Sequence, residues 1–295
     1  MSLTPEPATR IYADPISDSS RWNAFTPRTG DIAVSTPPKS GTTWTQGILA
    51  LLISGDTEVD ADVSVKSPWI DIIHRDLAQV MEVLEAQDHR RHIKSHSPLD
   101  CIPYWNELRY ITVYRHPIDV HFSMQKHLGN LKQEDGQAPP PKAPSESFAV
   151  FLEDDAGHAS LSHILDHYRA TLARRSRGNL IRLHYADMLA DLEGAMAQIA
   201  EHVGISHPPR TMQALAEAAT FKNMKANATR FVPASGQNFW RSDAGFFDSA
   251  SSNKWEGLLT RKDLAAYDAK ADAALTQNER QWLEWGATKF AAGSV

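Results

Sequence analysis

The chain has 295 residues, and its 42% hydrophobic and 22% charged content, with 15 glycines and 17 prolines, excludes a disordered, collagen-like or coiled-coil protein. The 30 Lys and Arg residues against 36 Asp and Glu residues give a net charge of −6, so the basic surplus of a general nucleic-acid binder is missing. The one cysteine, Cys101, cannot form an intrachain disulfide or a cysteine-based zinc site, which favours a reducing, cytoplasmic location.

The amino-terminal residues 1–18 are polar and lack the basic and apolar regions of a signal peptide. The longest apolar run, residues 48–53, is far shorter than the ~20 residues that span a bilayer. We therefore expect a soluble protein without stable membrane insertion.

Predicted strands and helices alternate along the chain. β-Branched and aromatic runs predict strands at residues 31–35, 109–114 and 180–185, and a weaker run predicts a fourth at 92–96. Helical patterns follow at residues 42–52, 117–128 and 191–203, and further helices are expected at 261–290. This alternation predicts an α/β fold in one domain, residues 1–295 with a core at about 31–260. A central parallel β-sheet is then flanked by helices, and ligands bind at the carboxyl ends of its strands.

Residues 131–147 interrupt this pattern. They contain Gly136, three consecutive prolines and Pro144, so they can continue neither a strand nor a helix. A stretch of this length without regular structure is typical of a mobile lid or a disordered loop.

The turn after the first predicted strand, residues 36–44, reads Thr-Pro-Pro-Lys-Ser-Gly-Thr-Thr-Trp. A glycine-bearing turn that leads into a helix directs backbone N–H groups and the positive helix end at one point, which suits a phosphate or sulfate. Lys39 adds a positive charge. The alternative interpretation of these residues is an ordinary helix cap. The Walker A lysine follows its glycine, whereas Lys39 precedes Gly41, which disfavours magnesium–nucleotide chemistry. Hydroxyl donors come from Ser40, Thr42 and Thr43.

These nine residues resemble the 5′-phosphosulfate loop of the cytosolic-type sulfotransferases, which use 3′-phosphoadenylyl sulfate (PAPS) and whose consensus reads roughly T-Y-P-K-S-G-T-T-W. Only Pro37 departs from it. Residues 114–123 resemble the family's 3′-phosphate segment, R-N-P-K-D-x-x-x-S, with Arg115 at a strand end and Ser123 two turns into the next helix.

A third segment, Lys94-Ser95-His96, resembles the family's K-T-H. On a strand, Lys94 and His96 share one face at a spacing of about 6.6 Å, so both can reach one cleft. Alone, His96 would be read as a buried structural histidine; its lysine neighbour and its place in the chain favour function.

Two later segments also resemble the family. Residues 185–188 resemble Y-E-D-M, whose tyrosine lies near the adenine, and residues 219–225 resemble the adenine-stacking segment T-S-F-D-x-M-K. The resemblance covers about residues 31–260. Residues 67–71 and 89–94 are more narrowly similar to bacterial glycolipid sulfotransferases.

The resemblance implies a P-loop-NTPase-like sulfotransferase fold and transfer of a sulfonyl group from PAPS to a hydroxyl, without a metal. His96 would accept the hydroxyl proton, Lys39 would stabilise the developing charge, and Lys94 would hold the 5′-phosphate or the leaving oxygen. The implied PAPS-binding residues are Lys39, Ser40, Gly41, Thr42, Thr43, Trp44, Arg115, Ser123, Tyr185, Thr220, Phe221 and Met224.

The acceptor is not identified by these motifs. The expected class is an apolar or amphipathic molecule of glycolipid, phenol or sterol type, because aromatic residues lie near the predicted site, although each could belong to the core. These residues are Trp69, Tyr104, Trp105, Phe122, Trp240 and Phe246.

Two segments depart from the family. Counting back from Trp255 places Asp248, Ser249 and Ala250 where the family has R-K-G, and a carboxylate there would repel the 3′-phosphate. Either Lys254 or Arg241 replaces the missing charge, or PAPS binds more weakly, or the register is shifted. The family's dimer segment, K-x-x-x-T-V-x-x-x-E, loses its two charged anchors here, so that dimer is not expected. It falls on Glu256, Thr260, Arg261 and Ala265.

Three other functions are less well supported by the sequence. A zinc enzyme is disfavoured because His92 and His96 are about 13 Å apart on a strand, and because His163 and His167 lack a third ligand. A nucleotide kinase would share the fold but needs a metal-binding carboxylate at a strand end, and the sequence offers no good candidate for it. A nucleotide-binding relative without activity is the non-enzymatic alternative, favoured only by Asp248.

Overall fold

The computed structural model describes residues 3–58, 62–132, 143–155, 157–233, 235, 239–247, 252–253 and 255–292. Its described strands form one parallel sheet in the order β2-β1-β3-β4. The strands are β1 Ile32–Ser35, β2 His92–Ser95, β3 Arg109–Tyr114 and β4 Leu180–His184. The prediction of a parallel sheet with strands at these four places is confirmed.

Both faces of the sheet are buried. Val34, Ile111 and Val113 belong to the core on one face, whereas Ala33, Ile93 and Tyr110 pack on the other. A strand that is covered on both sides needs no polar face, and this explains why the strands appear in the sequence as short apolar runs rather than as alternating patterns.

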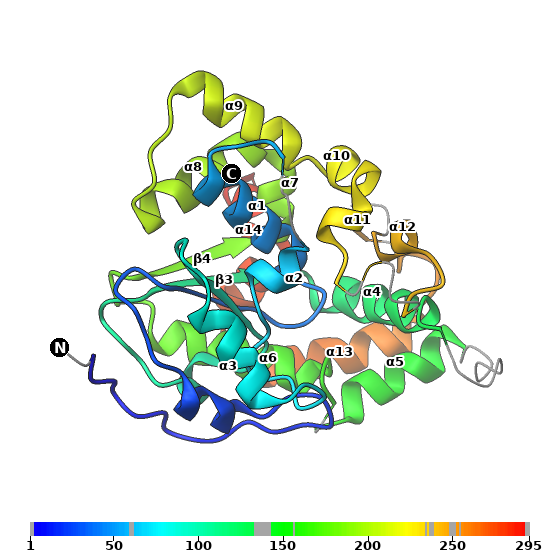
Figure 1. The fold of residues 1–295 in the computed structure, drawn as a ribbon. Coiled ribbons are helices and arrows are strands. Elements are labelled where there is room, and N and C mark those ends of the chain that lie inside the picture. Colours follow the sequence, from blue (N-terminus) through cyan, green and yellow to red (C-terminus); the bar gives the residue numbers. More distant parts are fainter. Residues whose placement is uncertain are drawn as a thin grey trace.

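Helices cover the two faces of the sheet (Figure 1). One face carries α1 Thr42–Ser54, α8 Leu192–Val203 and α9 Pro209–Ala218. The other carries α3 Leu77–Glu85, α5 Pro144–Glu153, α6 Leu161–Ala173 and α13 Arg261–Ala274. The last helix, α14 Gln277–Ala292, is kinked at Gly286 and packs against β4 and α7 Tyr185–Ala190. The predicted helices at 42–52, 117–128 and 191–203 are all present.

The remaining elements are short, apart from α4. They are η1 Ser19–Ala24, α2 Val63–Lys66, η2 Leu99–Cys101, α4 Pro117–Gly129, α10 Phe221–Ala226, α11 Ala228–Phe231 and α12 Asp243–Phe246. Helices α4, α10, α11 and α12 gather on the right-hand side of Figure 1. The described part of the chain contains no helix long and apolar enough to cross a membrane.

The irregular stretch predicted at residues 131–147 ends earlier than the sequence indicates. Helix α5 begins at Pro144, inside that stretch. A proline at the first helical position loses no hydrogen bond, because the N–H that it lacks would have no partner within the helix. Residues 133–142 of the predicted loop lie outside the described residues.

Candidate active site

The chain turns between β1 and α1, where the sequence predicts a glycine-bearing turn. Lys39 and Gly41 both have a positive φ, 63° and 113°. This backbone conformation favours glycine at position 41, where a Cβ would also lie 3.1 Å from Cδ2 of Tyr185 and crowd that ring. The hydroxyls of Thr36 and Thr42 are 2.6 Å apart and close the turn across its base.

This turn has donors available for an anion. Helix α1 has no side-chain cap at Gly41, so its first N–H groups are left for a ligand or water. The Ser40 hydroxyl is fully buried, and no partner contacts it among the described residues. A buried hydroxyl without a partner is costly, and a phosphate or sulfate oxygen would satisfy it.

Lys39 points toward α4. Its Nζ lies 3.1 Å from Nδ1 of His127 and 4.8 Å from the centre of the Phe246 ring. Burial, followed by the charges of Lys39 and Lys94, lowers the pKa of His127 to about 2, so the imidazole is neutral and accepts from the ammonium. The sequence reasoning missed His127, although its spacing of four residues from Ser123 places both on one face of the helix.

His96 follows β2 and is 5% exposed. Its Nδ1 lies 2.7 Å from the carbonyl oxygen of Thr36, which can only accept, so Nδ1 carries the proton and Nε2 keeps its lone pair. The Trp69 ring meets the imidazole edge-on at 4.8 Å. Burial, then the charge of Lys94, holds the pKa of His96 well below its ordinary value.

Lys94 also contacts Trp69, with its Nζ 3.9 Å from the centre of the indole ring. Burial lowers the pKa of Lys94 to about 8, against the opposing charge of Asp71. The indole is fixed in turn, because Trp69 Nε1 donates to the buried Asp71 carboxylate, which also accepts from the hydroxyls of Ser95 and Ser97, each at 2.5 Å. Trp69 therefore forms a rigid wall beside Lys94 and His96.

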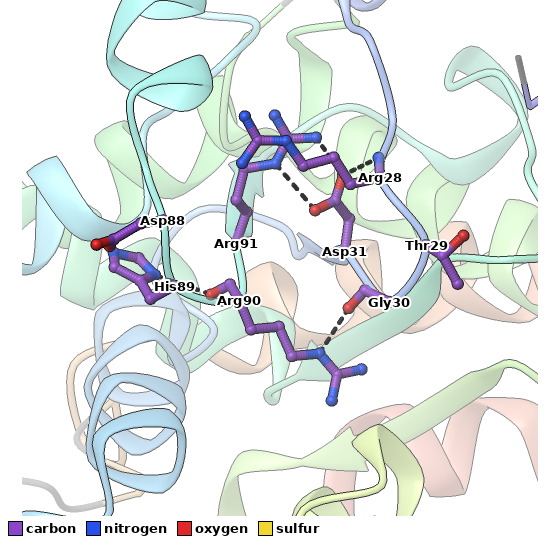
Figure 2. Close-up of a pocket in the computed structure, with 8 residues that line it drawn as sticks. All are labelled: Arg28, Thr29, Gly30, Asp31, Asp88, His89, Arg90 and Arg91. Carbon is purple, nitrogen blue, oxygen red and sulfur yellow. Dashed lines mark hydrogen bonds and ion pairs between the residues drawn. The ribbon is translucent and has the colours of Figure 1, made fainter.

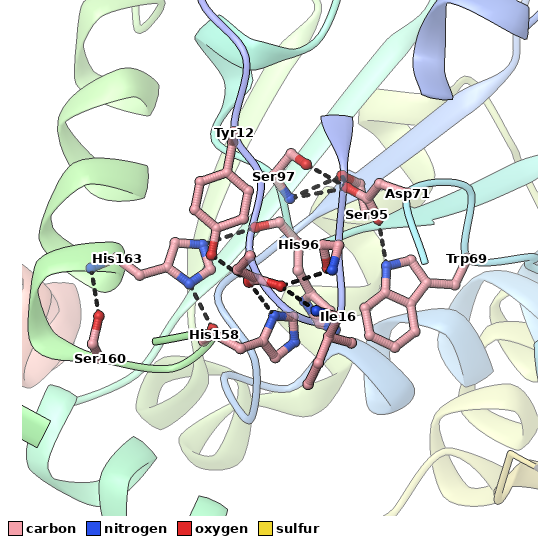
Figure 3. Close-up of polar contacts among 12 residues, drawn as sticks. Tyr12, Ile16, Trp69, Asp71, Ser95, His96, Ser97, His158, Ser160 and His163 are labelled. Carbon is pink, nitrogen blue, oxygen red and sulfur yellow. Dashed lines mark hydrogen bonds and ion pairs between the residues drawn. The ribbon is translucent and has the colours of Figure 1, made fainter. Parts of the chain in front are cut away.

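Two further histidines, His158 and His163, lie beside His96 (Figure 3). The ring of His158 is 5.3 Å from that of His96, and Nε2 of His163 lies 3.0 Å from the backbone carbonyl of His96. His158 is paired with Asp14 at 2.7 Å. The sequence reasoning missed the pair of His158 and Asp14, because no local pattern joins residues so far apart in the chain.

The residues expected at the 3′-phosphate lie near the turn. Arg115 is 7% exposed and its guanidinium lies 4.7 Å from the centre of the Tyr185 ring, which itself packs against Gly41. Ser123 is half-buried on α4. Arg241 is exposed, and its backbone N–H donates to the carbonyl of Asn130. The segment that departs from the family, Asp248, Ser249 and Ala250, lies outside the described residues, as does Lys254.

The residues expected at the adenine are only partly brought together. Trp44 meets Tyr185 edge-on at 5.4 Å and donates from Nε1 to the carbonyl of Ala219, next to Thr220, which caps α10. Phe221 is half-buried beside Phe247. Met224, however, is 1% exposed and belongs to the core, where a Cβ at Gly47 would lie 2.8 Å from its methyl group.

The aromatic residues considered for the acceptor divide into two groups. Tyr104 and Trp105 are core residues, 4% and 3% exposed, on the sheet face below α3, and Phe122 packs against a second core cluster. Trp240 and Phe246 instead surround His127, at 5.0 and 5.5 Å between ring centres. Together with Trp69, they give the site apolar walls.

A separate cleft of about 480 Å³ opens where β1 and β2 begin, away from these residues (Figure 2). Its arginines are already engaged: Arg28 donates to the carbonyls of Glu85 and Gln87, Arg90 to those of Gly30 and Val203, and Arg91 to Asp31. The cleft is therefore built by structural hydrogen bonds. Within the described residues, no group of three or more His, Cys, Asp or Glu side chains could hold a metal ion.

A family model described as "Sulfotransferase domain" matches residues 29–279. The chain is 31% identical to a glycolipid sulfotransferase of Mycobacterium bovis over 94% of both chains. It is 23% identical to sulfotransferase 2A1 of Macaca fascicularis over 86% of this chain and 87% of the relative.

Solved structures share the fold. Retinol dehydratase in a complex with retinol and PAP is 20% identical, with a TM-score of 0.72 over 88% of this chain and 84% of that one. Mouse sulfotransferase SULT7A1, complexed with PAP, is also 20% identical, with a TM-score of 0.71 over 93% of both chains. The sheet and its helices are therefore arranged as in these enzymes.

Proposed function

The chain belongs to the sulfotransferase family, and we propose that it transfers the sulfonyl group of PAPS to a hydroxyl of an apolar or amphipathic acceptor of glycolipid, phenol or sterol type. The observation that carries this proposal is the state of His96, whose Nδ1–H is bound to the Thr36 carbonyl and whose Nε2 keeps a lone pair beside Lys94 and Trp69. A neutral imidazole fixed in one tautomer is suited to accept a proton from an alcohol.

The residues around the turn fit a donor with two phosphates. The buried Ser40 hydroxyl, the uncapped N–H groups of α1 and Lys39 would hold the 5′-phosphosulfate, which supplies the sulfonyl group. Arg115 and Ser123, on the neighbouring strand end and helix, would hold the 3′-phosphate. To reach the donor, Lys39 would exchange His127 for phosphate oxygens.

The reaction then needs one proton transfer and one displacement. His96 Nε2 takes the proton of the acceptor hydroxyl, whose oxygen forms a bond to sulfur. The bond from sulfur to the bridging oxygen breaks, and its electron pair stays on the phosphate. Lys39 and Lys94 stabilise that charge, and the buried setting strengthens their effect.

The walls of the site support an acceptor with an apolar part. Trp69, Trp240 and Phe246 offer aromatic surface near His96 and Lys39. The similarity to glycolipid sulfotransferases supports a lipid-like or small-molecule acceptor rather than a nucleic acid. We also propose that the chain acts as one cytoplasmic domain, in keeping with the one sheet that the described strands form and with its single cysteine.

One experiment separates this function from its rivals. The purified protein is incubated with PAPS and a panel of alkyl glycosides, phenols and sterols, and release of adenosine 3′,5′-bisphosphate is followed with and without each acceptor. Acceptor-dependent release supports sulfonyl transfer. Phosphorylation of an acceptor by ATP and magnesium would favour a kinase, and binding of the bisphosphate without any turnover would favour an inactive relative.

A further inference from the structure

We propose that His158, held by Asp14, determines acceptor specificity by binding a second oxygen of the acceptor, next to the hydroxyl that His96 deprotonates. The enzyme then prefers acceptors with hydroxyls on two adjacent carbons. This inference rests on the proposed function and adds a substrate class to it, the vicinal diols.

The first support is the way in which Asp14 is anchored. Its Oδ1 accepts from the backbone N–H groups of Ile16 and Ser17, both at 2.7 Å, and its Oδ2 accepts from the Tyr12 hydroxyl at 2.6 Å. Burial alone would raise the pKa of Asp14, but these bonds and the contact with His158 outweigh it and hold the pKa well below its usual range. Asp14 is therefore a fixed carboxylate.

The second support is the effect of this carboxylate on His158. Asp14 Oδ2 lies 2.7 Å from Nδ1, so Nδ1 carries a proton and the plane of the ring is set. Nε2 is then the only other ring atom that can form a hydrogen bond, and no partner contacts it among the described residues. The carboxylate thus orients an imidazole whose second nitrogen is left for a ligand.

The third support is the position of this ring. It lies 5.3 Å from the His96 ring and 5.7 Å from the Trp69 ring, and those two rings are 4.8 Å apart, so the three rings form one cluster (Figure 3). With hydrogen bonds of about 2.7–3.2 Å, two rings this close can each bind one of two oxygens on adjacent carbons. Trp69 can pack against the carbon skeleton that joins them.

The chemistry of Nε2 suits a hydroxyl rather than a charged group. With Nδ1–H bound to Asp14, a neutral His158 accepts from a hydroxyl, and a protonated one donates to it. A hydroxyl can do either. An acceptor with a single hydroxyl leaves Nε2 of His158 without this hydrogen bond, and the kcat/KM of that acceptor is then lower than the kcat/KM of the diol.

The test compares two alcohols that differ by one hydroxyl, 1,2-decanediol and 1-decanol, with PAPS as donor. The wild-type kcat/KM should be about tenfold higher for the diol than for the monohydric alcohol, because one hydrogen bond contributes about this factor. Having two reactive hydroxyls would by itself raise kcat/KM only about twofold. His158→Phe keeps an aromatic ring beside Trp69 but removes Nε2. It should bring the ratio down to that about twofold level. The exposed His74 provides the matched control, and His74→Phe should leave the ratio unchanged.

The thermal shift caused by adenosine 3′,5′-bisphosphate shows whether each variant is folded and binds the nucleotide. A His158→Phe variant that shows the wild-type shift and keeps the diol preference overturns the inference, as does a wild type that sulfonates both alcohols equally well. A wild type that forms no sulfate ester with either alcohol or with the glycosides, phenols and sterols overturns the proposed function as well. If His158→Phe does not fold, Asp14→Asn replaces it in the test, because this variant loosens the His158 ring. It must then reduce the ratio of kcat/KM for the diol to kcat/KM for the alcohol.

Discussion

The Nδ1 atom of His96 lies 2.7 Å from the carbonyl oxygen of Thr36. The contact follows from the sheet, because Ser35 and Ser95 pair in parallel register and the next residues of β1 and β2 emerge side by side. The turn proposed to bind the 5′-phosphosulfate and the proposed base are thus joined by one hydrogen bond. That bond also fixes which nitrogen of His96 can accept a proton.

His96→Ala should lower kcat by about 10² to 10⁴, the usual contribution of a general base, and leave binding of adenosine 3′,5′-bisphosphate nearly unchanged. Steady-state kinetics and calorimetry measure the two effects. The exposed His74 is again the control, because His74→Ala should change neither. Near-full activity of His96→Ala with an unactivated alcohol would show that His96 is structural.

The pH profile of kcat/KM follows from the lowered pKa values of His96 and Lys94. Burial and the charge of Lys94 hold the pKa of His96 well below 6.5, so Nε2 is already unprotonated there and the rate should fall only at lower pH. Burial lowers the pKa of Lys94 to about 8, so its charge is lost, and the rate should fall, as the pH rises through about 8.

Lys94→Arg keeps a positive charge at high pH, since a guanidinium does not titrate in this range. The alkaline fall should therefore move to higher pH in this variant, and the acid side should stay where it is. An acid limb at pH 6.5 in the wild type, or an alkaline limb that Lys94→Arg does not move, would contradict these assignments.

Adenosine 3′,5′-bisphosphate should raise the melting temperature more than adenosine 5′-monophosphate does, because Arg115 and Ser123 add contacts to the second phosphate. Arg115→Ala and Ser123→Ala should each reduce the shift caused by the bisphosphate and leave the shift caused by the monophosphate nearly unchanged. Differential scanning fluorimetry measures both shifts. Equal melting-temperature shifts for the two nucleotides in the wild type would show that Arg115 and Ser123 do not bind the second phosphate.

The buried ion pair of Arg91 and Asp31, which lies where β1 and β2 begin, should contribute strongly to the free energy of unfolding. Both side chains are almost fully buried, and Asp31 accepts from Nε at 2.9 Å and from a terminal nitrogen at 2.5 Å. Asp31→Asn leaves the guanidinium buried without its counter-charge and should cost about 3–5 kcal/mol in urea unfolding. The exposed pair of Arg177 and Glu6 is the control, and Arg177→Gln should leave the unfolding midpoint unchanged. A loss below about 1 kcal/mol for Asp31→Asn would contradict this reading.

The sheet was predictable because its signals are local. Apolar runs mark β1, β3 and β4, and the helices that follow them end at glycines or begin at a proline, as with Pro117 and Gly204. The turn at Lys39–Gly41 was predictable for the same reason, since its conformation depends on adjacent residues.

What the sequence reasoning missed depends on tertiary packing. The partners Asp14 and His158 are 144 residues apart and meet only because the amino-terminal segment packs against the loop before α6. The burial of Met224 above Gly47 in the core was also missed, because a motif does not reveal burial; its place at the adenine stays a prediction. The start of α5 at Pro144 was missed because proline stops a helix when it lies inside but not when it lies first.

The most direct test of the account uses PAPS with a radiolabelled sulfonate group, an acceptor found in the panel, and mass spectrometry of the product. The wild type should form a labelled sulfate ester with one adenosine 3′,5′-bisphosphate released per ester, and His96→Ala should bind the bisphosphate but form almost no ester. A labelled ester formed equally fast by His96→Ala, or no ester with any acceptor while ATP and magnesium yield a phosphorylated product, would contradict the account.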